Sequence, residues 1–372
     1  MQYKLTKNFI ERYEKFSRSD VFKDVNEYSK SDYWKYSASR VKVEVSENNV
    51  TATGESGFYT SSSNNLKEIR RKVFSVMKSP SKLTLWLWRK IGLPIEGIKL
   101  LDQFEAFQKV MDRDLITDSA LSPYRVNFDN HRNRNKLISS VGKCKENYFE
   151  IVQGRVSFSV HVQLAYYHLN ILYSYVDLNN WQEKKVVLEI GAGNGNLMSI
   201  LKSHASSNTT IIDIDLPETI SHSVLYIASV FPSAKILMPN EVESIKHKID
   251  FHDYDFVFLI PNQAHLIDDD FVDLSINVHS FQEMTHKQIN EYFNLIQRVG
   301  KNNSYFFTSN RVEKLPSGVG SYEKETTVLP NRFSDYPWNN SNEIIIFEIC
   351  RMTRLIQLDS NFIRLEKIKK IL

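Results

Sequence analysis

The chain is poor in cysteine, in long apolar runs and in net charge. Its two cysteines, Cys144 and Cys350, cannot build a disulfide framework, and so few thiols are typical of a reducing cytoplasm. No run approaches the roughly 18 apolar residues of a membrane span, and the first residues lack the apolar core of a secretory signal. A formal net charge of +3 gives no reason to expect nucleic acid as a partner. We therefore expect a soluble, cytoplasmic protein.

The chain is long enough for two domains, at 372 residues, and its hydrophobic fraction of 42% is ordinary for a globular protein. The first part carries apolar stripes at helical spacing, and an alternating stretch near residues 41–53 predicts a β-hairpin. From about residue 151, strands and helices alternate, which predicts a mostly parallel sheet. We expect a mostly helical accessory or substrate domain over residues 1–150 and an α/β domain over residues 151–372.

A glycine-rich turn follows the first strand of the second part, in residues 186–197, Val-Val-Leu-Glu-Ile-Gly-Ala-Gly-Asn-Gly-Asn-Leu. Alternating glycines allow positive φ and let a ligand lie against the backbone. A dinucleotide-binding turn would place glycine or alanine where this chain has Asn196. An acid, Glu189, stands two residues before the first glycine. The pattern therefore favours another nucleoside cofactor, and a nicotinamide cofactor stays as the alternative.

A second acid follows the next expected strand, about twenty residues past the glycines. Asp215 fits the end of this strand, and Asp213 is the second choice. Two carboxylate oxygens suit the two hydroxyls of a ribose. The alternative role for Asp215 is that of a helix N-terminal acid before Pro217. Later strands are expected at residues 234–238, 254–260, 272–278, 304–308 and 343–350, and which of the first two is the third strand of the sheet stays open.

Two other segments allow functional interpretations. Residues 125–136 collect arginine, lysine and histidine among asparagines, which is typical of a solvated loop. Forked arginine donors would also suit a phosphate of a nucleotide sugar or a lipid-linked glycan. Residues 83–88 are apolar and predict a buried helix, or a contact in a homodimer.

Several of these motifs together resemble a known family. The glycine turn with Glu189, Asp215-Leu-Pro-Glu, Ser280-Phe-Gln-Glu-Met and Asn310-Arg311 are similar to the bacterial sugar O-methyltransferases, a branch of the class I S-adenosylmethionine (SAM)-dependent methyltransferases. The resemblance covers about residues 150–350. It implies a Rossmann-like sheet with helices on both faces and SAM as the cofactor. It also implies methylation of a sugar hydroxyl, in surface-polysaccharide or glycoside biosynthesis.

The resemblance assigns the cofactor site to the glycine turn and to the ends of the following strands. The cofactor-binding residues expected from it are Glu189, Gly191, Ala192, Gly193, Asn194, Asp215, Leu216, Asn262, Gln263 and Asn277. Asn262 or Gln263 would meet the adenine edge after the third strand. Arg155, His265 and Arg311 are expected to contact the acceptor, which would be a sugar, a nucleotide sugar or a glycan.

Catalysis is expected on the loop after the strand at residues 272–278, because ligands of such sheets bind at the carboxyl ends of the strands. Methyl transfer to a hydroxyl needs positioning and removal of the hydroxyl proton. We expect His279 to be the base and Glu283 to orient it or to act as a second base, with His265 in reserve. A core histidine and a helix-entry carboxylate are the alternatives. His279, Glu283 and His286 lack the tight spacing of a metal site, so no metal is expected.

The sequence leaves other functions open. A methyltransferase for a non-sugar molecule and a nicotinamide-dependent oxidoreductase are the enzymatic alternatives. A scaffold that keeps the fold without catalysis is the third class.

Overall fold

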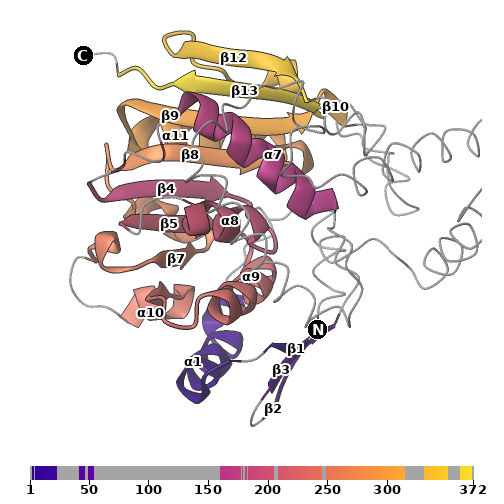
Figure 1. The fold of residues 1–372 in the computed structure, drawn as a ribbon, viewed down its shortest axis with the longest axis vertical. Coiled ribbons are helices and arrows are strands. Elements are labelled where there is room, and N and C mark those ends of the chain that lie inside the picture. Colours follow the sequence, from indigo (N-terminus) through magenta and orange to yellow (C-terminus); the bar gives the residue numbers. More distant parts are fainter. Residues whose placement is uncertain are drawn as a thin grey trace, which may run out of the picture.

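The computed structural model of the chain shows an α/β sheet flanked by helices (Figure 1). It describes residues 2–3, 5–22, 42–46, 49–53, 160–176, 178, 181, 183–204, 208–244, 249–314, 331–350 and 361–370. Arg155 and the segments 83–88 and 125–136 lie outside these residues, as does most of the predicted N-terminal domain.

An eight-stranded sheet forms the centre of the described chain, in the order β12-β13-β9-β8-β4-β5-β7-β6. Neighbouring strands from β9 to β6 pair in parallel, whereas β13 pairs antiparallel with both β9 and β12. The strands are β4 (Lys185–Ile190), β5 (Thr209–Ile214), β6 (Ile236–Leu237), β7 (Phe256–Leu259), β8 (Val272–Val278), β9 (Gly300–Arg311), β12 (Glu343–Ile349) and β13 (Asn361–Lys367). The sheet begins in its middle with β4, extends through β5 and β7, and then returns to β8 on the other side of β4.

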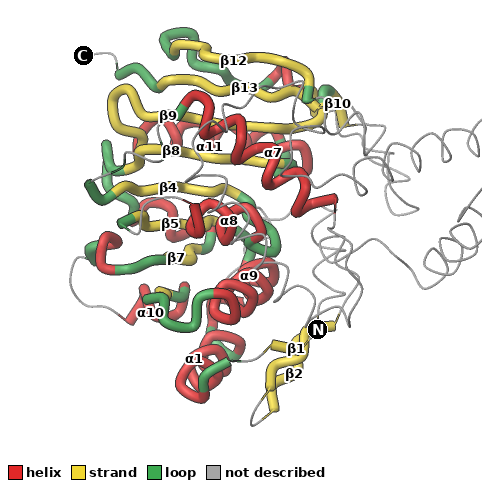
Figure 2. Tube along the Cα trace, viewed as in Figure 1, coloured by secondary structure: helices red, strands yellow, loops and turns green. Residues whose placement is uncertain are grey.

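Helices cover both faces of this sheet (Figures 1 and 2). Helices α7 (Val160–Tyr175), α8 (Asn196–His204) and α9 (Pro217–Val230) share one apolar core with the first face. Helix α11 (His286–Val299) shares a second core with the opposite face. Strand β5 is buried along its whole length, as expected for a parallel strand covered on both sides. The expected Rossmann-like α/β class with helices on both faces is confirmed.

The structure identifies the third strand of the sheet, which the sequence left open. Strand β7 pairs with β5, and the two-residue strand β6 lies outside it at the edge. Strand β13 was not expected from the sequence. The same is true of the short ribbon formed by β10 (Glu313–Lys314) and β11 (Asn331–Arg332).

Helix α11 begins after Thr285, which forms a capping box with Gln288, as the sequence pattern Thr-x-x-Gln predicts. The glycine that follows the helix, Gly300, would be expected to have a left-handed backbone, but it does not. Gly300 has φ −66° and already belongs to β9. A Cβ at this position would lie 2.6 Å from Ile368 Cδ1 and 2.9 Å from Ser304 Oγ. Close packing, rather than positive φ, therefore requires glycine here.

The described N-terminal elements pack against the edge of the sheet that carries β6. Strands β2 (Lys42–Ser46) and β3 (Asn49–Thr53) form an antiparallel hairpin, which β1 (Gln2–Tyr3) extends. Helix α1 (Lys7–Ser17) contacts α10 (Pro239–Ser244). The Arg12 guanidinium donates to Glu241 and to the Ile236 carbonyl, and Tyr13 Oη donates to the Ser221 carbonyl at 3.1 Å. These contacts join α1 to the α7–α9 side of the molecule.

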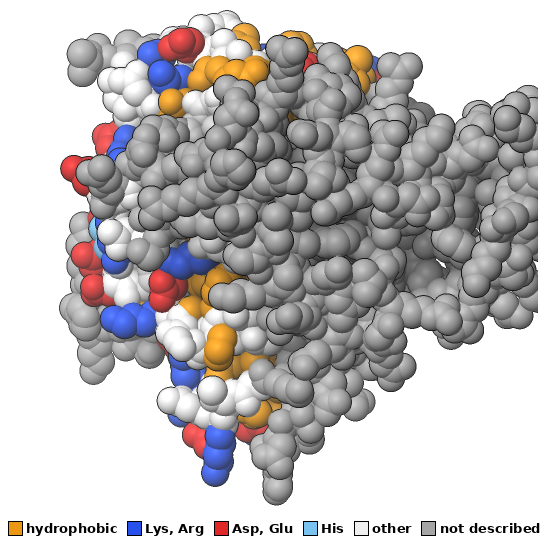
Figure 3. Space-filling model, in the orientation of Figure 1, with side chains coloured by type: hydrophobic (Ala, Val, Ile, Leu, Met, Phe, Trp, Pro, Cys, Tyr) orange, Lys and Arg blue, Asp and Glu red, His pale blue; other side chains and the backbone are white. Residues whose placement is uncertain are grey.

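The surface of the described residues carries both signs of charge. Basic and acidic side chains alternate over the part of the molecule visible in Figure 3. Hydrophobic side chains gather near β12, where Ile344 and Phe347 are about half exposed (51% and 52%). Among the described helices, none is both long and apolar enough to cross a bilayer.

Candidate active site

The carboxyl ends of β4, β5, β7, β8 and β9 meet at one edge of the sheet. The chain reverses direction across the sheet between β4 and β8, and ligands of open α/β sheets bind at such a switch point. The glycine turn follows β4, Asp215 follows β5, η5 (Pro261–Leu266) follows β7 and the His279 loop follows β8. Most of the predicted site residues therefore belong to this edge.

The glycine turn has the backbone that its sequence predicts. Gly191, Gly193 and Gly195 all have positive φ, at 75°, 63° and 79°. A Cβ on Gly191 would lie 2.2 Å from Ser280 Oγ and 2.5 Å from Ser280 Cβ. Glycine is therefore required at position 191 for two reasons. Its positive φ disfavours a side chain, and the close approach of the His279 loop leaves no room for one.

Three buried carboxyl groups lie next to this turn. Glu189 and Asp213 are direct partners in the parallel ladder between β4 and β5. Asp213 accepts from Ala192 N–H and from the Ser223 hydroxyl, both at 3.4 Å. Asp215 accepts from Gly193 N–H at 3.0 Å and from Leu216 N–H at 2.7 Å. Both aspartates thus fasten the glycine turn to the end of β5.

Burial of these acids disfavours their charged forms. It raises the pKa of Glu189 to about 8, with a contribution from the charge of Asp215. Burial also raises the pKa of Asp213 and of Asp215, although hydrogen bonds to both oppose the shift. From α11, the pKa of Tyr292 is raised by burial and by the charges of Asp215 and Asp213. A cation placed among these groups would stabilise their ionised forms.

A buried amide network fixes the loop after β8 to the neighbouring strands. Asn277 Nδ2 donates to the Ile190 carbonyl at 2.9 Å and to Ser280 Oγ at 2.7 Å. Asn277 Oδ1 accepts from Asn310 Nδ2 at 2.8 Å and from Phe281 N–H at 3.3 Å. Both polar atoms of Asn277, a predicted cofactor residue, therefore bond within the protein.

A second set of contacts fixes the same loop from β9 and the β10–β11 ribbon. Gln282 Oε1 accepts from Arg311 N–H at 2.8 Å, and Gln282 N–H donates to Asn310 Oδ1. Asn331 Nδ2 donates to the Met284 carbonyl at 2.6 Å. Glu283 Oε1 lies 3.6 Å from Lys314 Nζ, and both side chains are largely buried. Lys314 and Asn331 carry no signal in the sequence, because strands as short as β10 and β11 leave no periodic pattern.

His279 occupies a strained position at the end of β8. It has φ 61°, which is rare for a residue with a side chain, and its N–H donates to the Ser309 carbonyl at 2.8 Å. Its Nε2 lies 2.5 Å from Asn361 Nδ2, at the start of β13. The ring also makes an edge contact with His168 of α7, with centroids 6.3 Å apart. Asn361 is thus one partner of His279, and Lys314 is one partner of Glu283.

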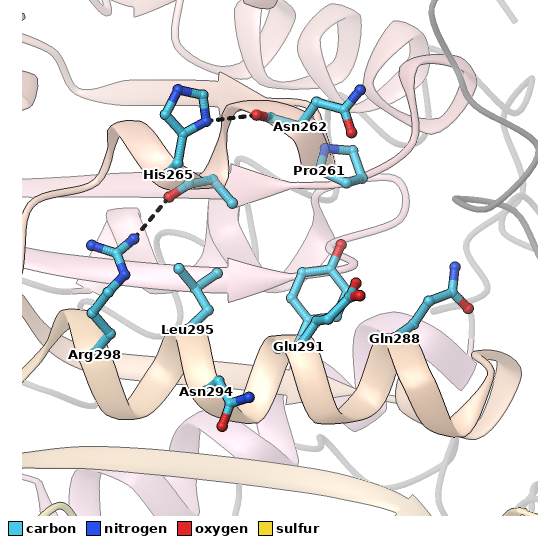
Figure 4. Close-up of a pocket in the computed structure, with 10 residues that line it drawn as sticks. Pro261, Asn262, His265, Gln288, Glu291, Asn294, Leu295 and Arg298 are labelled. Atoms are coloured by element: carbon cyan, nitrogen blue, oxygen red, sulfur yellow. Dashed lines mark hydrogen bonds between the residues drawn. The ribbon is translucent and has the colours of Figure 1, made fainter.

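A pocket of about 480 Å³ lies between η5 and α11 (Figure 4). Asn262 and His265 line it from η5, and His265 Nδ1 contacts the Asn262 carbonyl at 2.7 Å. Gln263 is buried and bonds to Ile260 N–H and to the Pro239 carbonyl. Of the two adenine-edge candidates, Asn262 therefore faces the pocket, whereas Gln263 holds η5 in place.

The remaining predicted residues also belong to the turn and its flanks. Asn194 Oδ1 accepts from Asn196 N–H at 3.2 Å, at the start of α8. Leu216 is the N-cap residue of α9, so Asp215 directly precedes that helix. Within the described residues, no group of three or more histidine, cysteine or acidic side chains has the arrangement of a metal site.

We predict that Gly191→Ala lowers the free energy of unfolding by at least about 2 kcal/mol, because it combines a left-handed backbone with a clash. Ser280→Gly removes both clashing atoms, so the double variant should lose less than the two single variants added together. Urea unfolding of the four proteins measures this coupling. Strict additivity would show that the two residues do not meet.

We also predict that the ligand-free protein loses stability as the pH rises from about 6.5 to 8. The pKa of Glu189 is raised to about 8, so the folded state keeps a proton that the unfolded state has lost, and stability falls through this window. Burial lowers the pKa of His168 to about 3, which acts in the opposite sense but below pH 6.5. Thermal unfolding across this range should show a shallower decline in Glu189→Gln. Equal slopes for the two proteins would contradict the assignment.

Comparisons with known proteins extend the description of the fold. No protein-family model matches the sequence, and no curated protein matches it. Among solved structures, a SAM-dependent methyltransferase from Aquifex aeolicus has 15% identity and a TM-score of 0.33, over 54% of this chain and 89% of that chain. A protein from Pyrococcus horikoshii OT3 has 13% identity and a TM-score of 0.36, over 57% and 93%. Haemonchus contortus phosphoethanolamine N-methyltransferase 1, in complex with phosphoethanolamine and S-adenosylhomocysteine, has 17% identity and a TM-score of 0.34, over 55% and 42%. These similarities concern the fold.

Proposed function

We propose that the chain is a SAM-dependent O-methyltransferase that methylates a hydroxyl of a sugar, nucleotide sugar or glycan. The observation that carries this proposal is the group of buried acids, Glu189, Asp213 and Asp215, around a glycine turn at the switch point of the sheet. Ionised carboxylates that are poorly solvated attract a cationic ligand. SAM carries a sulfonium and an ammonium group, so its charge complements this site.

The same charge argument weighs against the nicotinamide alternative. A dinucleotide would bring its anionic pyrophosphate to the glycine turn. There it would meet Asp213 and Asp215, which already accept hydrogen bonds from the turn amides. The ionised forms of these acids would repel the pyrophosphate, and strongly so in a buried site. Titration with reduced nicotinamide dinucleotide, followed by fluorescence, should therefore show no saturable binding.

The positions of the predicted residues support a specific arrangement of the cofactor. The methionine part would lie against Gly191 and Gly193, with Glu189 beneath it. Asp215 accepts two backbone hydrogen bonds and one from the Thr219 side chain, which leaves acceptor capacity for a ribose hydroxyl. Asn262 would meet the adenine edge from η5. Asn194 in the glycine turn and Leu216 at the start of α9 would contact the cofactor through their backbone atoms.

On the acceptor side, His279 is the proposed general base. The side chain of His279 is partly exposed at the carboxyl edge of the sheet, and its ring packs against the buried His168. The imidazole takes the proton of the acceptor hydroxyl as the oxygen attacks the methyl carbon. SAM, held by the glycine turn and its acids, would supply the methyl group as its carbon–sulfur bond breaks, and it would leave as the neutral thioether S-adenosylhomocysteine. Arg311 and His265 are proposed as acceptor contacts, and Glu283, paired with Lys314, as a fixed charge beside the reaction.

A radiolabelled-methyl assay tests the proposal. The full chain would be incubated with SAM and with nucleotide sugars, free sugars and glycan fragments, with and without a chelator. Transfer to a hydroxylated sugar with no effect of the chelator supports the proposal. Transfer confined to amines or to non-sugar molecules would overturn the acceptor class, and loss of activity with chelator would overturn the metal-free mechanism. Absence of SAM binding by calorimetry would favour the scaffold alternative.

We predict that SAM binds more tightly as the pH rises from about 6 to 8. The raised pKa of Glu189 means that the free protein must release a proton before the carboxylate can pair with the cation. Below that pKa, each pH unit should change the affinity by up to about tenfold for one released proton. Calorimetry in buffers of different ionisation enthalpy counts the protons.

Glu189→Gln is the matched variant for this measurement. It should bind SAM more weakly and release fewer protons, because it removes the titrating group. If this variant bound SAM with wild-type affinity and still released a proton, the proton would come from another group.

We predict that His279→Ala lowers turnover by about 10²–10⁴-fold while the dissociation constant for SAM stays nearly unchanged. His279→Gly should lose as much turnover but be more stable than His279→Ala by about 1 kcal/mol, because glycine relieves the left-handed backbone. His252→Ala, before β7 and at the opposite edge of the sheet, is the matched control. Wild-type turnover in His279→Ala would remove His279 from the mechanism.

A further inference from the structure

Behind His279 lies a set of buried polar side chains that the proposed mechanism does not yet use. Asn361 is 1% exposed, and His168 and Ser309 are fully buried. They come from β13, α7 and β9, and they surround the end of β8. Among the described residues, the two ring nitrogens of His168, Ser309 Oγ and Asn361 Oδ1 have no hydrogen-bond partner. Buried polar atoms without partners are rare in native proteins, so each of them calls for an explanation.

The contact between Asn361 and His279 has two chemically different forms. An amide has the same outline when its oxygen and nitrogen exchange places, so either end can face Nε2 at 2.5 Å. If Asn361 Nδ2 donates to Nε2, the ring proton is on Nδ1 and the lone pair of Nε2 is already used. Neither nitrogen can then take a proton from an acceptor hydroxyl. If Asn361 Oδ1 accepts from Nε2–H, the lone pair on Nδ1 is the basic one.

We infer that Asn361 is the positioning residue for His279: its side-chain oxygen accepts from Nε2–H and holds the imidazole in the tautomer whose Nδ1 is the base. This inference rests on the proposed function, since it concerns the same base. It assigns a role to a residue of the last strand, far from every motif of the site in sequence.

The backbone makes this contact rigid. Asn361 is opposite Arg311 in the ladder between β13 and β9, and its carbonyl accepts from Cys350 N–H at 2.7 Å. His279 is tied to the same strand β9 through the Ser309 carbonyl. Asn361 and His279 are therefore both held by backbone contacts with β9, which fixes their side chains relative to each other. The left-handed φ of His279 is kept against its cost of about 1–2 kcal/mol, as expected where a side chain must point in one direction.

His168 supports the ring without adding charge. Its ring packs on His279 at an interplanar angle of 88° and on Phe307 at a centroid distance of 5.5 Å. Burial lowers the pKa of His168 to about 3, so this ring stays neutral at the pH of any ordinary assay. When His279 takes the acceptor proton, the new positive charge meets a neutral ring and an amide oxygen. Repulsion from a second imidazolium is thereby avoided.

The test is the tautomer of His279, read from long-range nitrogen–proton correlations of the full chain labelled with ¹⁵N-histidine. The His279 signals are identified by their loss in His279→Gln. At pH 8 without ligand, we expect Nε2 to be protonated and Nδ1 to be unprotonated. A proton on Nδ1 in the wild-type protein would overturn the inference. This measurement needs no acceptor, so it gives a result even if no methyl transfer is found.

Two variants add a kinetic readout. In Asn361→Asp a carboxylate can only accept, so it should keep the Nε2–H tautomer, and turnover at pH 8 should stay within about tenfold of the wild type. Because the carboxylate also favours the protonated ring, turnover should fall more steeply below pH 8 than in the wild type. Asn361→Leu removes the acceptor, and turnover should fall about 10²-fold or more with an unchanged KM for SAM and a mixed tautomer. If both variants lose turnover equally while the wild-type ring is protonated on Nδ1, Asn361 has only a packing role.

Discussion

The buried negative charge beside the glycine turn is the constraint on which the rest of the site depends. Glu189 and Asp213 are neighbours in the ladder, and Asp215 follows at the end of the same strand. The free protein relieves part of their repulsion by keeping protons and by directing N–H groups of the turn at Asp213 and Asp215. The N-terminus of α8, which follows the turn, adds a favourable dipole. Once ionised, these acids would attract a cationic ligand but not a neutral or anionic one.

The acceptor half of the site depends on hydrogen bonds rather than on charge. Ser280 packs against Gly191, and Asn277 donates to the Ile190 carbonyl at the carboxyl end of β4. The glycine turn and the His279 loop therefore form one rigid unit. Asn310 and Gln282 then join that unit to β9. These residues are distant in sequence but hydrogen-bond to one another, and such a buried network favours one geometry. The proposed methyl transfer would need this rigidity to position the acceptor.

The sequence predicted the local geometry of the glycine turn better than the contacts of the His279 loop, for a physical reason. The turn, its acids and the capping box at Thr285 are local patterns, whose residue types follow from φ, burial or an orphan N–H. Gly300 shows the limit of such reasoning, because its need for glycine comes from Ile368, far along the chain. His168 and Asn361 carry no local signal. His168 lies on an apolar helix and Asn361 lies in a strand. Their positions become informative when the folded sheet places both next to His279.

The two halves of the site also differ in charge, as the proposed methyl transfer would require. In that reaction the bound cofactor would lose its positive charge, while His279 would gain one as it takes the proton. A site that is negative around the cofactor and neutral around the base favours binding of the cation and still accommodates the new imidazolium. A carboxylate beside His279 would favour its protonated form and would move the proposed base reaction to higher pH. His168 and Asn361 add no charge beside His279, and Glu283 is paired with Lys314, which suits the base that we propose.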